Sequence, residues 1–595
     1  MENSRSMRGR FHAAVLAGLT ASMAFSGVVP ALAETGKVQI KQNTINKDTT
    51  YEGYRLFKAD IATAGGQDKA QNITWDTDAD KAKVLAFLSQ GVDVTGASQT
   101  YEAWLTAHNH TATGAGDLAQ NAAEYIAEMI NGSAEDEGAN TTPKTTTGTS
   151  FATNFAQYLN SNQVTVDVPH LATDTDYTGD QGYYLFVTTA STIGTDESGT
   201  APVWVAVSDT AKEIQEKTAT VTVEKQVKED STAAYGKTAD ANKDQLLNFK
   251  ITGTMPQNYG AYDTYKYVFT DTLPGGMSLA AGNTSTVKVK MYANAAAATA
   301  DADGAAGTDV TNKFSITYES DTLTVGNTNL KDATNGISGV TKDTVFVVYY
   351  QARLDNDAVI GSTGNTNTVH LTYTNDPITN SDGTTTDKKT TTYTYELDIE
   401  KVDKDTREKL AGAKFTIQLT AAEGASDTAS VGKYLQSDGS LGDTQYEFTT
   451  NENGKITVPR IDRGTYTIHE TAAPTHYDTI DADVVVTIGA TVPTEPEAAI
   501  ETMTATYSGG EAYADSHPGK VPTGGQATDA TDGIYTINAE SSKGVIGARI
   551  GDPRVIVLPG TGMTPSQLGT IVGAALLAGG IFIVVKRQRE DAQLG

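Results

Sequence analysis

The sequence predicts a mainly β protein, with β-sandwich domains in a row and a mixed α/β domain at the N-terminus. Three observations predict this class. Short apolar alternations recur along most of the chain, and patches rich in Gly, Thr, Asn and Asp separate them, as in strands joined by turns. The 595 residues are too many for one hydrophobic core, so three domains are expected. Apolar residues at helical spacing occur in the first segment after the N-terminal leader.

The amino-acid composition limits the compartment in which the protein works and the partners that it can bind. The chain has no cysteine, which excludes disulfides as a source of stability. Asp and Glu number 73 against 44 Lys and Arg, for a net charge of −29. No basic surface dominates, so nucleic acid is not expected as a partner. The acidic excess fits a solvated extracellular surface.

The N-terminus has the order of a secretory signal peptide. Three arginines precede an apolar stretch over residues 13–29, and small residues follow it up to Ala33. We therefore expect residues 1–33 to be removed, with cleavage after Ala33 and Glu34 as the first mature residue.

The first mature domain is expected to span 34–216. Strands are predicted at 51–57, 182–187 and 203–207, and helices at 78–90 and 117–130. All three tryptophans lie in this domain, and we expect them to pack in its core: Trp75, Trp104 and Trp204.

Two β domains are expected to follow, over 217–392 and 393–557. From about residue 218 the alternation is almost purely that of strands. A low-complexity stretch over 375–392 is predicted to separate the second β region from the third.

In the last domain, polar side chains occupy positions that should point into the core. The apolar residues of 393–399 share one strand face, and Lys401 continues that face. In the same way Tyr466 and Ile468 place Glu470 inward. Burial of either charge alone is costly, and desolvation lowers a lysine pKa and raises a carboxyl pKa. A neutral amine beside a protonated carboxyl is a nucleophile beside a general acid.

A third polar residue is expected on the final strand of this domain. Ile546, Ala548 and Ile550 share a face that Asp552 continues, and Asn538 is a competing candidate.

The middle domain carries a second set of this kind. Valines on both sides flank Lys225 on one strand face, and alternating aromatic residues over 265–269 lead to Asp271. Asn367 and Asn375 share a face of another strand, so the alternation along that strand does not decide which of them lies near Lys225. Asp271 could instead cap a turn.

The C-terminus carries a short motif, an apolar run and a basic tail. The motif is Leu558-Pro559-Gly560-Thr561-Gly562, and the apolar run over 568–585 and four mostly basic residues follow it. This order resembles the LPxTG sorting signal of Gram-positive surface proteins, so residues 558–595 are expected to be that signal. The resemblance implies that a sortase cuts between Thr561 and Gly562 and joins the Thr561 carbonyl to an amine. The apolar run alone would also permit an ordinary C-terminal membrane anchor.

Both β domains resemble isopeptide-forming pilin domains. Residues 401–413 resemble the opening strand of CnaB-type domains, and 466–477 look like their E-box, YxLxETxAPxGY, with Ile468 for Leu and His476 for Gly. Residues 269–274 and 365–375 resemble the middle domain of isopeptide-forming major pilins. The resemblance implies tandem Ig-like, Cna-type β-sandwiches.

In the last domain the resemblance implies an intramolecular isopeptide bond from Lys401 to Asp552, or to Asn538, with Glu470 assisting. The alternative there is a buried salt-bridge network without a bond.

In the middle domain the resemblance implies an isopeptide bond from Lys225 to Asn367, or to Asn375, with Asp271 assisting.

A polymer also needs an amine to receive Thr561 of the neighbouring subunit. By similarity to sortase-built shafts this is a lysine near the end of the first domain. The common YPK form is absent here, and Lys217 is our candidate, with Lys212 second. The alternative is a solvated lysine on a linker.

The family resemblance implies the shaft subunit of a sortase-polymerised pilus. Its implied partners are sortase, identical pilin subunits and peptidoglycan, directly or through a basal pilin, with room for accessory pilins and host surface ligands. The expected location is the Gram-positive cell wall or pilus fibre, after transient membrane anchoring. The alternative is a monomeric wall-anchored adhesin that binds host protein or glycan. No turnover enzyme, cofactor or metal is expected, because no Ser/His/Asp, metal-ligand or phosphate-loop pattern stands out and the eight histidines are scattered. The isopeptide chemistry would be self-directed and single-turnover.

Overall fold

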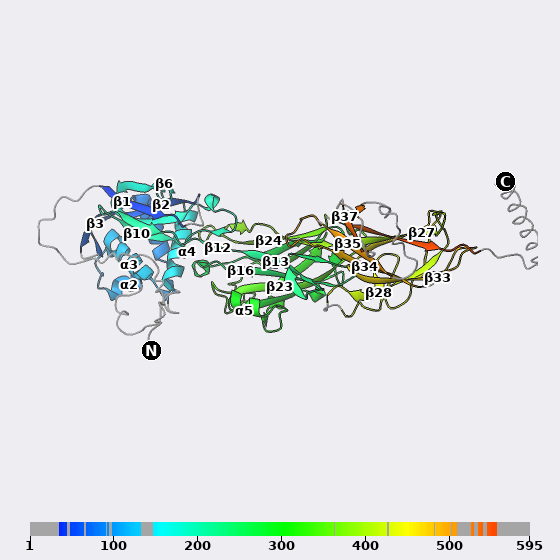
Figure 1. Cartoon of the computed structure of the whole chain (residues 1–595). Coiled ribbons are helices and arrows are strands. Elements are labelled where there is room, and N and C mark those ends of the chain that lie inside the picture. Colours follow the sequence, from blue (N-terminus) through cyan, green and yellow to red (C-terminus); the bar gives the residue numbers. More distant parts are fainter. Residues whose placement is uncertain are drawn as a thin grey trace, which may run out of the picture.

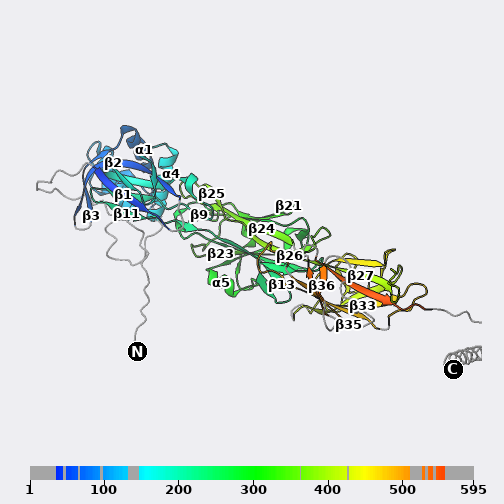
Figure 2. The ribbon, with the colours of Figure 1, turned by 45° about the horizontal axis from the view of Figure 1, so that its top comes forward.

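Three β-rich units follow one another along an elongated molecule (Figure 1). The computed structural model describes residues 35–555, apart from 44–47, 65–66, 91, 94–97, 132–146, 362, 425–427, 481, 501, 509–524, 529–533 and 540–543. The predicted signal cleavage site and the sorting motif lie outside the described residues. Figure 2 shows the same succession of units from a second direction.

The N-terminal unit contains two β-sheets. The larger has the strand order β10-β8-β2-β3, with β6 also paired to β2: β10 (Val203–Val207), β8 (Gly182–Thr188), β2 (Thr50–Ala64), β3 (Gln67–Trp75) and β6 (Val168–Ala172). The smaller has the order β11-β1-β7: β11 (Lys212–Gln215), β1 (Thr35–Lys41) and β7 (Asp176–Asp180). Two short pairs complete it: β4 (Val92–Asp93) with β5 (Ser98–Gln99), and β9 (Glu197–Ser198) with β12 (Ala219–Thr220).

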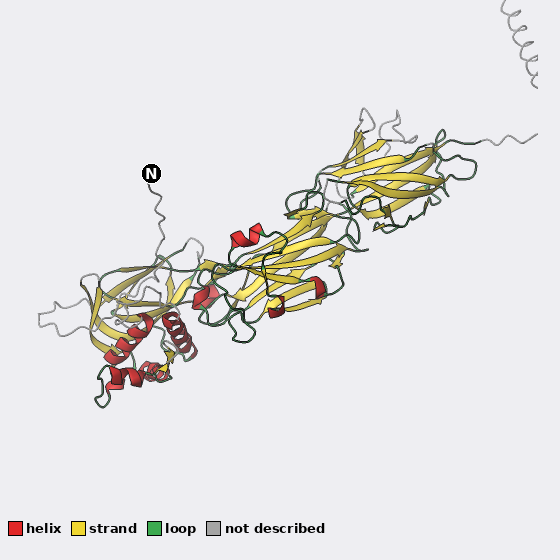
Figure 3. Ribbon diagram, turned by 90° about the horizontal axis from the view of Figure 1, so that it is seen from below, coloured by secondary structure: helices red, strands yellow, loops and turns green. Residues whose placement is uncertain are grey.

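The larger helices of the molecule gather in this unit (Figure 3). They are α1 (Asp78–Leu88), α2 (Tyr101–Ala107), α3 (Ala119–Asn131) and α4 (Thr147–Ser161). The structure confirms the predicted helices at 78–90 and 117–130 within two residues at each end, whereas α2 and α4 were not predicted. Trp104 and Trp204 are buried in the core, as expected, and Trp75 is partly buried against it. No helix among the described residues is both long and apolar enough to cross a membrane.

The middle unit is a sandwich of two seven-stranded sheets. One has the order β14-β13-β16-β23-β19-β20, with β18 paired to β23: β14 (Ala234–Gly236), β13 (Val223–Glu229), β16 (Leu247–Thr254), β23 (Val345–Leu354), β19 (Lys288–Tyr292), β20 (Thr308–Asp309) and β18 (Met277–Leu279). The other has the order β15-β26-β24-β17-β22-β21, with β25 paired to β24: β15 (Thr238–Asp240), β26 (Lys388–Tyr393), β24 (Asn365–Thr374), β17 (Tyr267–Thr272), β22 (Thr322–Asn327), β21 (Ser315–Glu319) and β25 (Asp382–Thr384). A short helix, α5 (Ala295–Ala300), lies outside the sheets.

The low-complexity stretch over 375–392 does not act as a separator. Its residues form β25 and most of β26, which both pair with β24 inside the middle unit. β-branched threonines suit a pleated strand, and Thr390, Thr391 and Thr392 are buried. The middle unit therefore runs on to the end of β26, and the first strand of the next unit begins two residues later.

The C-terminal unit packs a three-stranded sheet against a nine-stranded one. The first has the order β32-β27-β38: β32 (Lys455–Ile461), β27 (Tyr395–Asp403) and β38 (Val545–Asp552). The second has the order β30-β29-β28-β33-β34-β35-β37-β36, with β31 paired to β28: β30 (Leu441–Gly442), β29 (Tyr434–Leu435), β28 (Lys414–Ala422), β33 (Gly464–Ala472), β34 (Val484–Ala490), β35 (Met503–Ser508), β37 (Ile534–Ala539), β36 (Gly525–Thr528) and β31 (Phe448–Thr449). Residues of both sheets contribute to one buried core.

Polar contacts join the N-terminal unit to the middle unit. Thr153 Oγ1 and Gln157 Nε2, both on α4, donate to the carbonyls of Ala261 and Pro377 at 3.1 and 2.8 Å. Ile378, which follows β24, is buried in the core of the N-terminal unit. The middle unit therefore completes the packing of its neighbour.

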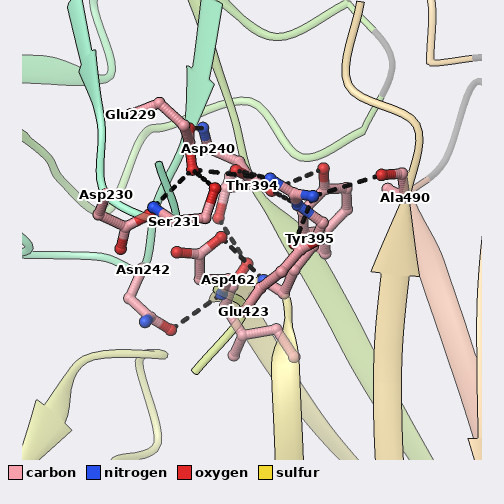
Figure 4. A network of polar contacts seen from close by, with 12 residues as sticks. Glu229, Asp230, Ser231, Asp240, Asn242, Thr394, Tyr395, Glu423, Asp462 and Ala490 are labelled. Carbon is pink, nitrogen blue, oxygen red and sulfur yellow. Dashed lines mark hydrogen bonds and ion pairs between the residues drawn. The ribbon is translucent and has the colours of Figure 1, made fainter. Parts of the chain in front are cut away.

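A network of charges joins the middle unit to the C-terminal unit (Figure 4). The Arg463 guanidinium makes a two-pronged contact with Asp240, with one N···O distance of 2.7 Å, and also contacts Glu423. The Tyr395 hydroxyl donates to Asp240 at 3.0 Å. Burial raises the pKa of Asp240 against the opposing effect of Arg463, and burial raises the pKa of Asp462 well above its usual value. One buried cation therefore holds together several carboxyls from both units.

Candidate cross-linking sites

The predicted residues of the last domain meet inside its sandwich. Lys401 lies on β27 and Asp552 on β38, and these strands pair in parallel with Lys401 opposite Ile550. Asp552 therefore follows two residues later on the same face. Glu470 reaches the pair from β33 of the facing sheet.

The three side chains are fully buried and in direct contact. Lys401 Nζ lies 2.9 Å from Glu470 Oε1, and it donates a hydrogen bond to Asp552 Oδ1. Glu470 Oε2 accepts the backbone N–H of Ile480 at 3.0 Å, which fixes the carboxyl. Asp552 Oδ2 has no hydrogen-bond partner among the described residues.

Burial raises the pKa of Asp552 to about 7, although Lys401 opposes the shift and Glu470 adds to it. Near neutral pH this carboxyl is therefore protonated in part of the molecules. Amide formation requires a protonated carboxyl in contact with an amine, because the carboxyl oxygen that departs must be protonated to leave as water. The residues that the strand pattern placed inward therefore meet in a buried contact between an amine and two carboxyls.

The competing acceptor lies on a different sheet. Asn538 is part of β37, which pairs with β35 and β36 at the far edge of the nine-stranded sheet. Lys401 belongs to the three-stranded sheet, so the strand order brings Asp552, and not Asn538, next to it in the sheet.

The predicted residues of the middle domain also converge. Lys225 on β13 belongs to one sheet, whereas Asp271 on β17 and Asn367 on β24 belong to the facing one. All three are buried, and Lys225 Nζ donates to Asp271 Oδ1 at 2.7 Å. Burial lowers the pKa of Lys225, and the neighbouring Asp271 opposes this shift. Asp271 Oδ2 and Asn367 Oδ1 are buried without a hydrogen-bond partner among the described residues.

A tyrosine that the sequence analysis missed completes this cluster. Tyr350 on β23 accepts a hydrogen bond from Lys225 Nζ at 2.9 Å and one from Asn367 Nδ2 at 2.8 Å. In the sequence, Tyr350 alternates with Phe346 and Val348, so it is expected on the same inward face of the strand. A buried phenol needs a polar partner, so a tyrosine in that phase marks a polar site in the core.

The alternative acceptor of this domain lies elsewhere. Asn375 follows β24 at its far end, and its Oδ1 accepts a hydrogen bond from Ser381 Oγ at 2.9 Å. Asn367 shares the Tyr350 hydroxyl with Lys225, whereas Asn375 lies beyond the end of β24.

The two candidate polymerisation lysines differ in their surroundings. Lys217 lies between β11 and β12; it is exposed, and its ammonium makes no hydrogen bond or ion pair within the described part of the chain. Partial desolvation lowers its pKa. Lys212, on β11, forms an ion pair at 2.7 Å with the fully buried Asp68. Lys217 is therefore the freer amine.

The residue before Lys217 anchors this segment. The buried Glu216 carboxyl accepts the Tyr51 hydroxyl at 2.7 Å and the backbone N–H of Asn43 at 2.5 Å. The Lys217 backbone N–H donates to Thr200 Oγ1 at 3.1 Å. These contacts hold the backbone while the lysine side chain is exposed.

No group of three or more His, Cys, Asp and Glu side chains in the described ranges is arranged to hold a metal ion.

Part of the C-terminal unit matches a known domain family. Residues 395–500 match the family model of the SpaA prealbumin-like fold domain. The chain is 24% identical over 283 residues to the trypsin-resistant surface T6 protein of Streptococcus pyogenes serotype M6. That alignment covers 41% of this chain and 48% of the T6 protein, so the chain spans about half the length of the curated relative it matches.

Solved structures of pilins are also similar. The T6 backbone pilin of serotype M6 Streptococcus pyogenes has a TM-score of 0.48 and 15% identity, over 88% of this chain and 100% of that one. The full-length major pilin SpaD from Corynebacterium diphtheriae has a TM-score of 0.43 and 14% identity, over 88% and 97%. The mainly β fold class is confirmed by the structure itself, and the predicted resemblance to backbone pilins is confirmed by the domain match and the T6 relative.

Proposed function

We propose that the protein is the shaft subunit of a covalent pilus, polymerised by sortase and attached to the Gram-positive cell wall. Its own residues form isopeptide bonds in two successive domains, and Thr561 of one subunit is joined to Lys217 of the next. The observation that carries this proposal is the buried contact of Lys401 with Glu470 and Asp552, which ties the first strand of the last domain to its final strand.

The bond in the last domain forms by loss of water. The neutral Lys401 amine attacks the Asp552 carboxyl carbon, the new C–N bond forms and the C–O bond breaks. Glu470 contacts the attacking nitrogen at 2.9 Å, and it accepts the proton that the nitrogen loses and returns it to the departing hydroxyl. Lys401 and Asp552 react once, so there is no turnover.

The position of this bond suits a shaft. β27 opens the C-terminal unit and β38 closes it, and the two strands are neighbours. Tension that enters at β27 and leaves after β38 passes directly through a Lys401–Asp552 bond, and the rest of the sandwich carries no load. Head-to-tail joining of such units is a heterologous contact that does not close, so it produces a filament.

Lys217 is the amine that the surroundings favour for this joint. It is exposed, its pKa is lowered by partial desolvation, and Glu216 anchors the segment that presents it. Deprotonation is required for attack on an acyl-enzyme, so a lowered pKa increases the reactive fraction. Lys212 is held by Asp68.

A denaturing gel of cell-wall extracts tests the proposal. We expect a ladder of boiling-resistant multimers from the wild type and from Lys212→Ala, and monomer alone from Lys217→Ala. A single monomer band from the wild type would refute the shaft and support the wall-anchored adhesin. A ladder that survives in Lys217→Ala would assign the joint to another amine.

A further inference from the structure

The Tyr350 hydroxyl lies between the two nitrogen atoms that change bonding in the middle-domain cross-link. Its oxygen is 2.9 Å from Lys225 Nζ and 2.8 Å from Asn367 Nδ2. We propose that Tyr350 is a catalytic proton relay, which carries a proton from the attacking nitrogen of Lys225 to the leaving nitrogen of Asn367. The inference rests on the proposed bond between these two residues.

The reaction needs such a transfer for its atoms to balance. When the neutral Lys225 amine attacks the Asn367 amide carbon, its nitrogen becomes positively charged and must lose a proton. The amide nitrogen leaves only as ammonia, so it must gain one. Tyr350 accepts the proton from Nζ while its own hydroxyl proton passes to Nδ2. The C–N bond to Nζ forms, the C–N bond to Nδ2 breaks, one ammonia leaves, and the phenol is restored.

The acid in this cluster is placed for a different task. Asp271 contacts Lys225 Nζ at 2.7 Å, but in the described structure it has no hydrogen bond to Asn367 Nδ2. Its second oxygen and the Asn367 carbonyl oxygen are both buried without a partner. Asp271 therefore holds and orients the attacking amine. Within the described residues, the Tyr350 hydroxyl is the group whose hydrogen bonds reach both nitrogens.

The surroundings of Tyr350 keep the relay in its working form. Its ring stacks on Phe249, with centroids 5.1 Å apart, which fixes the hydroxyl between its partners. Burial and the nearby Asp271 raise the phenol pKa well above its usual value, so the hydroxyl stays protonated and can both accept and donate. Burial lowers the pKa of Lys225, which favours the neutral amine that attacks.

The last domain provides a contrast that agrees with this role. The acceptor there is the acid Asp552, and Glu470, which lies 2.9 Å from Lys401 Nζ, passes the proton from the attacking nitrogen to the departing hydroxyl. Within the described residues, the hydrogen bonds and ion pairs of Lys401 Nζ are to carboxyls, and no tyrosine hydroxyl contacts it. The bridging phenol is present where the leaving group is an amide nitrogen.

The rate of bond formation tests the relay. Full-length chain is recovered unreacted from inclusion bodies and refolded, and the Lys225–Asn367 peptide with its loss of one ammonia is followed by mass spectrometry. We expect Tyr350→Phe, which keeps the ring, to slow the reaction by roughly a hundredfold, within the usual range for general acid–base groups. Tyr265→Phe is the control, because the Tyr265 hydroxyl is equally buried but has no hydrogen-bond partner in the described structure. It should react at the wild-type rate.

The outcomes separate the relay from the bond itself. If the wild type never loses ammonia at these residues, the proposed bond is wrong. If the wild type reacts and Tyr350→Phe reacts at the same rate, only the relay is refuted.

A second substitution distinguishes a relay from a merely structural hydroxyl. 2,3-Difluorotyrosine at position 350 keeps the ring and the hydroxyl but is a stronger acid. A relay predicts a displaced pH profile of the rate. A profile identical to that of the wild type would overturn the proposal even if Tyr350→Phe folds poorly.

Discussion

Replacement of Lys401 by methionine should lower the free energy of unfolding of the C-terminal domain by about 5 kcal/mol. Lys401 and Asp552 are 151 residues apart in sequence. On the chain-entropy model, a covalent link across a loop of that length contributes about 5 kcal/mol by restricting the unfolded chain. Methionine keeps an unbranched apolar stem in the core. Asp552 remains buried without its cation and takes up a proton, since burial already raises its pKa to about 7.

Differential scanning calorimetry of the mature chain measures this loss. In a domain of this size 1 kcal/mol shifts the melting temperature by about 2–4 °C, so ~10–20 °C is expected. The variant should also be heavier than the cross-linked wild type by one water, after correction for the side-chain change. Lys414→Met is the control, because the exposed ion pair of Lys414 with Glu447 contributes little. A shift no larger than that of the control, or a wild-type mass without loss of water, would refute the reasoning.

Three further predictions follow from the same contacts. The rate of bond formation in the last domain should rise as the pH rises through about 7 and then level off, because the reacting pair holds one proton between a neutral amine and a carboxylic acid, and the surplus proton is lost near the raised pKa of Asp552; a rate that falls through this range, measured by loss of water, would contradict it. Glu470→Ala should leave the intact mass one water above that of a cross-linked chain, and full cross-linking in this variant would remove the proton-transfer role. Arg463→Met should destabilise the joint between the last two units by about 3–5 kcal/mol at neutral pH, because the buried Asp240 loses its cation. A carboxyl whose pKa is raised on folding stabilises the native state at low pH and loses that contribution as the pH rises, so acid should restore part of the stability. Thermal unfolding at acidic and neutral pH checks this, and equal losses at both would count against it.

The strand pattern predicted which charged side chains point inward. Lys225, Asp271, Lys401 and Glu470 are all buried, as the alternation of apolar residues around them indicated. This was predictable because successive side chains of a strand point to opposite faces, so the face of a residue follows from its immediate neighbours.

Short helices held by tertiary contacts were harder to predict. α2 and α4 were missed, and α4 packs against residues of the middle unit through Thr153 and Gln157. Tertiary contacts of this kind, which no local window contains, supply much of the stability of a short helix.

The sequence by itself determined the fold class and the inward lysines, because each depends on residues that are close along the chain, and it predicts the two terminal signals in the same way. The tertiary structure decided which groups meet. Asn367 and Asn375 have the same phase, and only the packing of β24 and the facing β13 brings Asn367 to Lys225. Tyr350 entered the site in the same way, since it lies 125 residues from Lys225 in sequence. Strand phase is a local property of the backbone, whereas strand order and register are set by the packing of the whole domain.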